Sequence, residues 1–455
     1  MSIDLPAMRR HFQSGATKPY AVRRQQLLLL KESLLQHEPA IAEALHADLK
    51  KSREESYGTE TGLVLAELNN TLKNLRKWMR PRRAGTNLVN LPSSSRIYRD
   101  PLGVVLIIAP WNYPLQLALV PLIGAIAGGN CVVVKPSEYA PATSALLEKM
   151  LAAIYPLEYV GVVQGDGAAV VTSMMQSFRF DHIFFTGSIP VGQRVYQLAA
   201  KDLVPVTLEL GGKSPVVVEH DADIATAARR IVIGKFINAG QTCIAPDYLL
   251  VHADVRERLL AGLRDTLLAF YGPTPEESYD YAKIIHEKRF DTLVNYLSQG
   301  RIIAGGNYDR QQLFIAPTLI EDVPPESPLM QEEIFGPILP VFVYRNMEEA
   351  LAIVRQHPNP LAFYLFTQNR EKQRAWMEQF TFGGGCINNT VWHFANHYLP
   401  FGGVGSSGIG AYHGKYSFEV FTHAKSVMRT PVWIDPSIKY PPYKGKLKWF
   451  RFFFR

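Results

Sequence analysis

The chain has 455 residues, 47% of them hydrophobic and 20% charged, and its formal net charge at pH 7 is +7. This composition excludes a disordered or fibrous protein and indicates a soluble globular one with two or three domains. The N-terminal residues lack the apolar core of a signal peptide, and no run of 18 apolar residues occurs, so no membrane span is expected. The excess positive charge lies in short patches, at residues 80–83 and near the C-terminus, so a nucleic-acid ligand is not expected.

The three cysteines, Cys131, Cys243 and Cys386, lie far apart in the chain and form no CxxC pair. They provide neither a disulfide framework nor the spacing of a metal site, and they favour a reducing, cytoplasmic compartment. Cys131 and Cys386 are interpreted as structural residues. Cys243, between a glycine-containing stretch and a proline, is either a buried small apolar residue or a nucleophile.

Residues 7–79 carry leucines at helical spacing, for example Leu27, Leu30 and Leu34, and are predicted to form helices that serve as scaffold. Pro81 ends this pattern. Residues 81–100 contain Pro, Gly and a serine run before an alternating segment, and they predict an excursion or an edge strand outside the core.

From Gly103 to about residue 185 the chain alternates fully apolar strands with helices, which indicates a parallel sheet covered on both faces. Such sheets bind ligands at the carboxyl ends of their strands. Polar and aromatic residues occur at these ends, namely Trp111 and Asn112, Lys135 and Glu138, and Gly187 and Ser188.

The glycine patterns in this region are weak signals taken alone. Gly187 and Gly192 open a helix whose N-terminus could face a phosphate. The one GxGxxG match, residues 403–408, does not follow an apolar strand and is interpreted as a loop, not a nucleotide site.

A second α/β region is predicted from residue 209 to about 380. Glu209 stands inside an apolar run, where a carboxylate is costly unless it is paired or used. This favours a nucleophilic role for Cys243, which follows about thirty residues later. The acidic stretch around Glu333 is by itself typical of a turn before a strand.

Seven motifs together resemble the aldehyde dehydrogenase superfamily, and most closely its class 3 branch of fatty and aromatic aldehyde dehydrogenases. The likeness covers almost the whole chain in matching order. The motifs are PWNYP (110–114), KPSE (135–138), FTGSIPVG (185–192), LELGGKSP (208–215), GQTCIAPD (240–247), EEIFGP (332–337) and the segment 399–421.

The resemblance implies an α/β fold with a Rossmann-type NAD-binding domain, an α/β catalytic domain and a small β oligomerisation element. The implied NAD-binding domain comprises residues 1–80, with the N-terminal helices, and residues 101–208. The catalytic domain comprises residues 209–385, and the bridging element residues 81–100 and 386–440. A homodimer is the implied assembly.

The resemblance also implies a mechanism. Cys243 would attack the aldehyde carbon, Glu209 would act as general base, and Asn112 would stabilise the oxyanion. The cofactor would be NAD, with NADP as an alternative, because the carboxylate of Glu138 would repel a 2′-phosphate. The implied cofactor contacts are Trp111, Lys135, Glu138, Gly187, Ser188, Gly192, Glu333 and Phe335.

The implied substrate pocket is mostly apolar and aromatic, which favours medium or long aliphatic and aromatic aldehydes. Its expected residues are Tyr113, Leu117, Phe236, Thr242, Ile244, His393 and Phe394. Two other functions stay open, a thioacylating enzyme that uses coenzyme A and a non-enzymatic membrane-associated protein that keeps the fold.

Residues 439–455 interleave six basic residues with seven aromatic ones and contain no acidic residue. The segment 441–455 is therefore predicted to be a separate tail. It would either pack on a partner subunit or contact an anionic membrane surface peripherally, and it is too short to span a bilayer.

Overall fold

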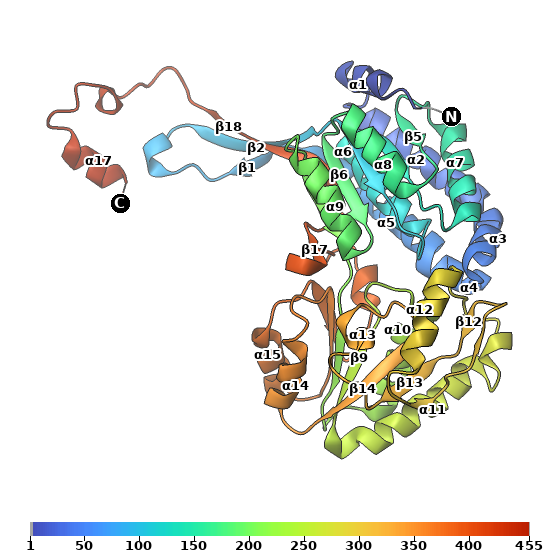
Figure 1. The fold of residues 1–455 in the computed structure, drawn as a ribbon. Coiled ribbons are helices and arrows are strands. Elements are labelled where there is room, and N and C mark those ends of the chain that lie inside the picture. Colours follow the sequence, from blue (N-terminus) through green and yellow to red (C-terminus); the bar gives the residue numbers. More distant parts are fainter. Residues whose placement is uncertain (1–2, 455) are drawn as a thin grey trace.

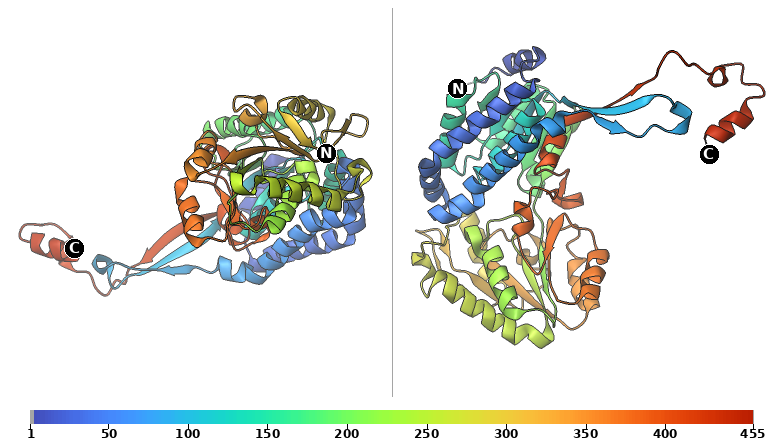
Figure 2. Two further views of the ribbon diagram at one scale, coloured as in Figure 1. Left: turned by 90° about the horizontal axis from the view of Figure 1, so that it is seen from below. Right: turned by 180° about the vertical axis from the view of Figure 1, so that it is seen from behind.

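The computed structural model describes residues 3–454, which form two α/β lobes and a long arm (Figure 1). The first lobe contains the N-terminal helices and one parallel sheet, and the second lobe contains the other sheet. The arm projects from the first lobe and carries the C-terminal tail beyond its end (Figures 1 and 2).

The six-stranded sheet of the first lobe has the order β17-β7-β6-β3-β4-β5. All neighbours are parallel except β17, which runs antiparallel to β7. Strands β3, β4 and β6 are buried on both faces, as their continuous apolar runs predict. The strands are β3 (Val104–Ile108), β4 (Cys131–Lys135), β5 (Val160–Val162), β6 (His182–Thr186), β7 (Val206–Glu209) and β17 (Gly408–Ile409).

Helices cover this sheet because each presents an apolar side to it. Helix α6 is buried along its whole length and packs on β3 and β4, with α2 and α5 outside it. Leu27, Leu30 and Leu34 are fully buried, whereas Leu35 lies at the solvent side of the same helix. The helices are α1 (Leu5–Gln13), α2 (Tyr20–Gln36), α3 (Glu38–Leu49), α4 (Arg53–Ser56), α5 (Gly62–Met79), α6 (Gln116–Gly128), α7 (Pro141–Ile154), α8 (Gly167–Ser177) and α9 (Ile189–Ala200).

The second lobe is built on a seven-stranded sheet of order β10-β13-β14-β9-β8-β15-β16. Only β10 is antiparallel to its neighbour. The strands are β8 (Pro215–Val218), β9 (Tyr248–His252), β10 (Arg301–Ala304), β13 (Thr318–Glu321), β14 (Ile338–Tyr344), β15 (Ala362–Phe366) and β16 (Gly384–Ile387). The helices are α10 (Ile224–Phe236), α11 (Arg256–Tyr271), α12 (Glu287–Leu297), α13 (Pro328–Gln331), α14 (Met347–Val354) and α15 (Arg370–Gln379), and β11 (Tyr308–Asp309) and β12 (Phe314–Ile315) form a small hairpin.

The arm is a three-stranded antiparallel sheet of order β1-β2-β18. Its strands are β1 (Arg82–Ala84), β2 (Ser94–Pro101) and β18 (Thr422–Arg429), and β18 is exposed after its first residue. The tail ends in the short helix α17 (Leu447–Phe453), which lies beyond the arm and away from both lobes (Figure 1). Within residues 3–454, no helix combines the length and the apolar character needed to cross a membrane.

Residues 386–440, predicted as part of the bridging element, contribute strands to two different sheets. Strand β17 pairs with β7 and so completes the sheet of the first lobe, while β18 belongs to the arm. The GxGxxG stretch forms a 3-10 turn, Gly405–Ser407, that leads into β17. The chain therefore crosses between the lobes a second time here, after the crossing that follows β7.

Candidate active site

Cys243 lies on a strained connection at the end of helix α10. The helix is followed by the tight turn Ile237–Gly240, in which Asn238 and Ala239 have φ values of 52° and 51°. Positive φ in non-glycine residues costs energy and is concentrated at functional sites. Gly240, at φ 74°, is required because a Cβ there would lie 2.3 Å from the carbonyl oxygen of Gly336.

Gln241 holds this connection in place from inside the protein. Its Nε2 donates to the carbonyl oxygens of Asn238 and Lys283, at 3.0 and 2.9 Å, and its Oε1 accepts from the Ile285 N–H at 3.0 Å. The fully buried amide is thereby satisfied, and Cys243 follows from a fixed backbone.

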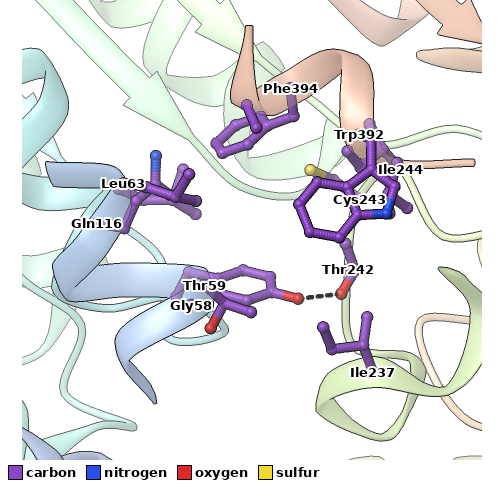
Figure 3. Close-up of a pocket in the computed structure, with 14 residues that line it drawn as sticks. Gly58, Thr59, Leu63, Gln116, Ile237, Thr242, Cys243, Ile244, Trp392 and Phe394 are labelled. Atoms are coloured by element: carbon purple, nitrogen blue, oxygen red, sulfur yellow. Dashed lines mark hydrogen bonds between the residues drawn. The ribbon is translucent and has the colours of Figure 1, made fainter. Parts of the chain in front are cut away.

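The sulfur of Cys243 faces a largely apolar cavity between the two lobes (Figure 3). The wall consists of aliphatic and aromatic side chains with a few polar ones, and a 2.6 Å hydrogen bond joins Tyr113 Oη to Thr242 Oγ1. The lining residues are Gly58, Thr59, Leu63, Tyr113, Gln116, Leu117, Ile237, Thr242, Cys243, Ile244, Val391, Trp392, Phe394 and Ala395.

Five of the expected pocket residues line this cavity, and two do not. Phe236, at 1% exposure, packs into the core at the end of α10, so that the next residue, Ile237, takes its expected place. His393 lies behind the wall, between Phe401 and the Cys386 thiol, whose sulfur is 3.6 Å from Nδ1. Val391, which precedes the 3-10 turn Trp392–Ala395, has a φ of 43°. The chain therefore turns so that Trp392 occupies the position expected for His393.

Glu209 ends strand β7 and is almost completely buried. Its backbone is paired on both sides, with Thr186 of β6 and Gly408 of β17. Within residues 3–454, neither carboxylate oxygen has a hydrogen-bond partner. Burial therefore raises the pKa of Glu209 well above its ordinary value.

The thiol of Cys243 is also held in its protonated form. Burial, with the nearby negative charges of Glu333 and Glu209, raises its pKa far above the ordinary value. Cys243 and Glu209 thus lie close enough to influence each other, although 33 residues of chain separate them in the sequence. A thiolate here needs a base or a positive partner.

Asn112 is buried after strand β3, and its side chain points toward the Cys243 loop. Its Nδ2 donates to the carbonyl oxygen of Gln241 at 3.0 Å, which uses one of the two amide N–H bonds. The backbone carbonyl oxygen of Asn112 accepts from Asn238 Nδ2 at 2.8 Å and from Lys51 Nζ at 3.1 Å.

A buried ion pair between Lys213 and Asp247 joins three of the recognised motifs. Lys213 Nζ also donates to the carbonyl oxygens of Leu329 and Glu332, and Asp247 Oδ1 accepts from the Ile334 N–H at 3.0 Å. The segment that carries Glu333 is therefore fixed against the segments around Glu209 and Cys243.

The carboxylate of Glu333 fits over Gly211, where a Cβ would lie 1.8 Å from Glu333 Oε2. Only glycine permits this approach. Burial, with the charge of Asp247 second in importance, raises the pKa of Glu333 to about 8. Phe335, two residues on at φ 43°, packs edge-on against Trp111 with ring centroids 5.3 Å apart.

The expected cofactor residues of the first lobe lie at adjoining strand ends, as parallel pairing of β3, β4 and β6 requires. Lys135 Nζ donates to Glu138 Oε2 at 2.7 Å and to the Pro136 carbonyl oxygen at 2.8 Å. Hydrogen bonds from Lys135 and from the Gly167 N–H outweigh burial, so the pKa of Glu138 is lowered.

Helix α9 begins directly after Gly187 and Ser188. Ser188 is exposed, and among the described residues its side chain makes no capping bond to the helix N-terminus. Gly192 is needed for close packing, since a Cβ there would lie 2.4 Å from Leu210 Cδ2. A helix N-terminus without a side-chain cap can bind an anion through its backbone N–H groups.

Sequence reasoning missed three supporting features, namely Gln241, the Lys213–Asp247 pair and the Lys51–Glu60 pair. All four charged side chains of these pairs are buried. A charged residue within an apolar stretch is the signal that could have pointed to each pair. However, Lys213 and Asp247 are far apart in the sequence, and Lys51 and Glu60 lie in a region predicted as scaffold.

Comparisons with known proteins agree with this geometry. The model of the aldehyde dehydrogenase family matches residues 5–427. The chain is 44% identical to 4,4'-diaponeurosporen-aldehyde dehydrogenase of Staphylococcus aureus, covering 98% of this chain and 97% of that protein. It is 40% identical to aldehyde dehydrogenase family 3 member A2 of Pongo abelii, covering 100% and 94%.

Solved structures show the same relation. The substrate-bound state of Staphylococcus aureus AldH superposes with a TM-score of 0.96 at 43% identity, covering 99% of this chain and 98% of that one. An indole-3-acetaldehyde dehydrogenase in complex with NAD+ has a TM-score of 0.85 at 27% identity, covering 94% and 88%. This chain therefore belongs to the aldehyde dehydrogenase family and is an oxidoreductase of the family 3 type.

Proposed function

We propose that the protein oxidises apolar aldehydes to carboxylic acids with NAD, through a covalent intermediate on Cys243. The observation that carries this proposal is the position of the Cys243 thiol, which faces an apolar cavity and lies close to the buried carboxyl group of Glu209. Cys243 lines the cavity, Glu209 lies near enough to raise the pKa of its thiol, and Asn112 donates to the carbonyl oxygen of Gln241, two residues before the cysteine.

In the first step, Cys243 Sγ loses its proton to Glu209 or water and forms a bond to the aldehyde carbon. The carbonyl oxygen becomes an oxyanion, and the second N–H of Asn112 Nδ2 donates to it. One such donor is worth about 3 kcal/mol in the transition state. Asn112 is suited to this role because its other N–H bond and its backbone carbonyl are already fixed.

The strand ends of the first lobe fit a bound dinucleotide. Lys135 and Glu138 would hold ribose hydroxyls as one donor and one acceptor, and the N-terminus of α9 at Gly187, Ser188 and Gly192 would face the pyrophosphate. Trp111 and Phe335, which pack edge-on, would position the nicotinamide end together with Glu333, whose charge acts on Cys243. When bound, NAD accepts the hydride that the substrate carbon releases.

Hydrolysis of the resulting thioester completes the reaction. Glu209, after it has released any proton from the first step to solvent, takes a proton from water. The hydroxide oxygen bonds to the acyl carbon, and the bond to Cys243 Sγ breaks to release the acid. A carboxylate with a raised pKa is a stronger base, and within residues 3–454 the carboxylate oxygens of Glu209 have no hydrogen-bond partner to lose.

The cavity favours aldehydes with an apolar chain or ring. Its wall is predominantly aliphatic and aromatic, with Trp392 and Phe394 on one side and Leu63 on another (Figure 3).

The decisive experiment measures NADH formation with a series of aldehydes, from acetaldehyde through decanal to benzaldehyde. We expect activity to rise with chain length.

Cys243→Ser should abolish turnover while NAD binding, measured by fluorescence titration, is retained. Cys386→Ser is the matched control and should keep its activity, because this thiol packs beside His393 behind the cavity wall. Turnover by Cys243→Ser would contradict the nucleophile assignment.

We further propose NAD over NADP, a homodimer and a cytoplasmic location with peripheral membrane contact. The carboxylate of Glu138, held by Lys135, disfavours a 2′-phosphate.

The exposed strand β18 offers an edge and apolar side chains, including Val427 and Met428, to a second copy. Sedimentation of the purified chain at twice its mass of 51.1 kDa would support the dimer.

A further inference from the structure

Lys51 and Glu60 form an ion pair that is completely buried in the first lobe. Lys51 Nζ lies 2.6 Å from Glu60 Oε1, and both side chains are 0% exposed. Removing two charges from water is costly, and such a pair is often no more stable than an apolar replacement of similar size. Its presence beside the proposed site therefore calls for a reason other than stability.

Both members of the pair hold the connection between strand β3 and helix α6, which carries Asn112. Lys51 Nζ donates to the Asn112 carbonyl oxygen at 3.1 Å and lies 4.0 Å from the centre of the Tyr113 ring. Glu60 Oε2 accepts from the Leu115 N–H at 2.8 Å and from the Gln116 N–H at 3.2 Å. The pair thus fixes the connection at four places.

Glu60 itself is presented by an unusual element, the π-helical turn Tyr57–Thr61. Such turns are rare and are frequently found at functional sites. The same turn provides Gly58 and Thr59 to the cavity wall. One buried ion pair therefore links the wall of the cavity to the backbone of Asn112.

We propose that the Lys51–Glu60 pair is a positioning device that sets the orientation of Asn112 toward the oxyanion. This inference rests on the proposed function, in which Asn112 is the oxyanion donor. Lys51 acts on the backbone carbonyl, and the Asn112 amide then has a single orientation, with one N–H on Gln241 and the other directed at the substrate oxygen.

A double-mutant cycle tests whether Lys51 acts through Asn112. The rate of the first turnover of NADH formation is measured for Lys51→Met, Asn112→Ala and the double variant, with saturating NAD. We expect each single variant to slow this step by about 10²-fold, since misplacing a catalytic group by about 1 Å has that effect. When Lys51→Met is added to Asn112→Ala, the rate of the first turnover should fall by less than about a further threefold.

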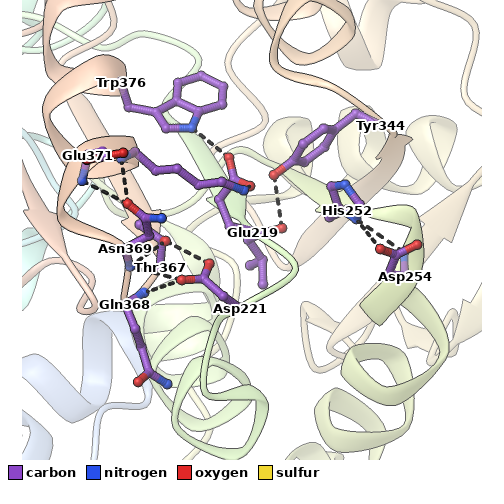
Figure 4. A network of polar contacts seen from close by, with 12 residues as sticks. Glu219, Asp221, His252, Asp254, Tyr344, Thr367, Gln368, Asn369, Glu371 and Trp376 are labelled. Carbon is purple, nitrogen blue, oxygen red and sulfur yellow. Dashed lines mark hydrogen bonds and ion pairs between the residues drawn. The ribbon is translucent and has the colours of Figure 1, made fainter.

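Glu219 provides a matched control in the second lobe. This buried carboxylate pairs with Lys372 and accepts from Trp376 Nε1 at 2.8 Å, next to the hydrogen bonds of Asp221 (Figure 4). Glu219→Gln should lower the melting temperature without changing the rate of the first turnover. A similar slowing in this variant would show that general destabilisation explains the Lys51 effect, and it would overturn the proposal.

Glu60→Gln keeps acceptors for the Leu115 and Gln116 N–H groups and removes only the charge, so it serves if Lys51→Met fails to fold. It should show the same non-additivity with Asn112→Ala. Additive losses in the cycle would overturn the positioning role and leave the proposed function intact. An unaltered rate in Asn112→Ala alone would overturn both the oxyanion role and this inference.

Discussion

Three acidic side chains with raised pKa values, those of Cys243, Glu209 and Glu333, surround the place where an aldehyde carbon would react. Each is raised chiefly by burial. All three are therefore more protonated at neutral pH than in water, and the negative charge of one disfavours ionisation of the next. The residues of the site favour base chemistry above neutrality.

The pH dependence of turnover follows from the direction of these shifts. A raised pKa means that the basic form accumulates only as pH increases, so kcat/KM should rise from pH 6 to pH 9 with a slope approaching about tenfold per unit. A profile that falls over this interval would contradict the roles of Cys243 and Glu209. Stopped-flow NADH absorbance measures the profile.

Glu209→Gln separates the two proposed steps. The amide cannot accept the proton of water, so steady-state turnover should fall by about 10²-fold. The first turnover of NADH should remain observable as a burst, because Cys243 still forms its intermediate. An unchanged steady-state rate would place the base at another residue, and Glu209→Asp serves as the control that keeps a carboxylate.

At this scale, the sequence predicted Cys243, Glu209 and Asn112 as a group, and the structure brings them together. Pocket residues were harder to predict, because neighbouring residues of a helix or turn point in different directions, so that a shift of one position decides whether a side chain faces the core or the cavity. Phe236 and His393 do not line the cavity for that reason, whereas their neighbours Ile237 and Trp392 do. The supporting ion pairs escaped prediction since their partners meet only in the folded chain.

Among the elements, the segments that carry the recognised motifs are fixed by one buried ion pair. Lys213 and Asp247 tie residues 329–334 to the strands of the second lobe, with three hydrogen bonds to backbone groups besides the pair itself. Glu333 is positioned by this attachment. The placement of a proposed cofactor contact therefore depends on two residues that precede strands β8 and β9 and do not line the cavity.

Asp247→Asn should destabilise the protein and loosen this segment. The change leaves the Lys213 ammonium buried without its charge partner, which costs about 3 kcal/mol or more. The measurement is the urea unfolding midpoint, together with the affinity for NAD, which should weaken. Asp254→Asn, on an exposed carboxylate, is the control and should change neither. Equal midpoints for the two variants would contradict the structural role of the pair.

Strands and helices were largely predictable, because parallel strands buried on both faces give continuous apolar runs. The pairing of β17 with β7 was not, since two residues carry no periodicity and their partner lies about 200 positions earlier. Residues 386–440 consequently contribute to the first sheet, the cavity wall and the arm. The division into domains stays a prediction that no strand pairing alone decides.

The whole molecule separates its reactive centre from its most exposed part. The cavity lies between the lobes, whereas the arm carries the tail well away from them (Figures 1 and 2). Large aromatic side chains of the tail are exposed to solvent, among them Trp449, Phe452 and Phe454. Such residues beside lysines and arginines are typical of segments that lie in a membrane interface.

Removal of residues 441–455 should therefore release the protein from anionic vesicles without lowering turnover of propanal. Co-sedimentation with phosphatidylserine-containing vesicles measures binding, and neutral vesicles are the control. Binding should weaken with salt, because lysine and arginine attraction to anionic lipid is screened. Undiminished vesicle binding by the truncated chain would contradict the membrane role of the tail.

The double pairing of β7 has a consequence for how Glu209 can move. Its backbone is hydrogen-bonded on both sides, to β6 and to β17, so the main chain cannot shift without breaking a sheet. Its carboxylate makes no such bonds within residues 3–454. Rotation about the side-chain bonds is then its remaining freedom. In the proposed reaction, Glu209 would therefore reach first the thiol of Cys243 and then the water by turning its side chain alone.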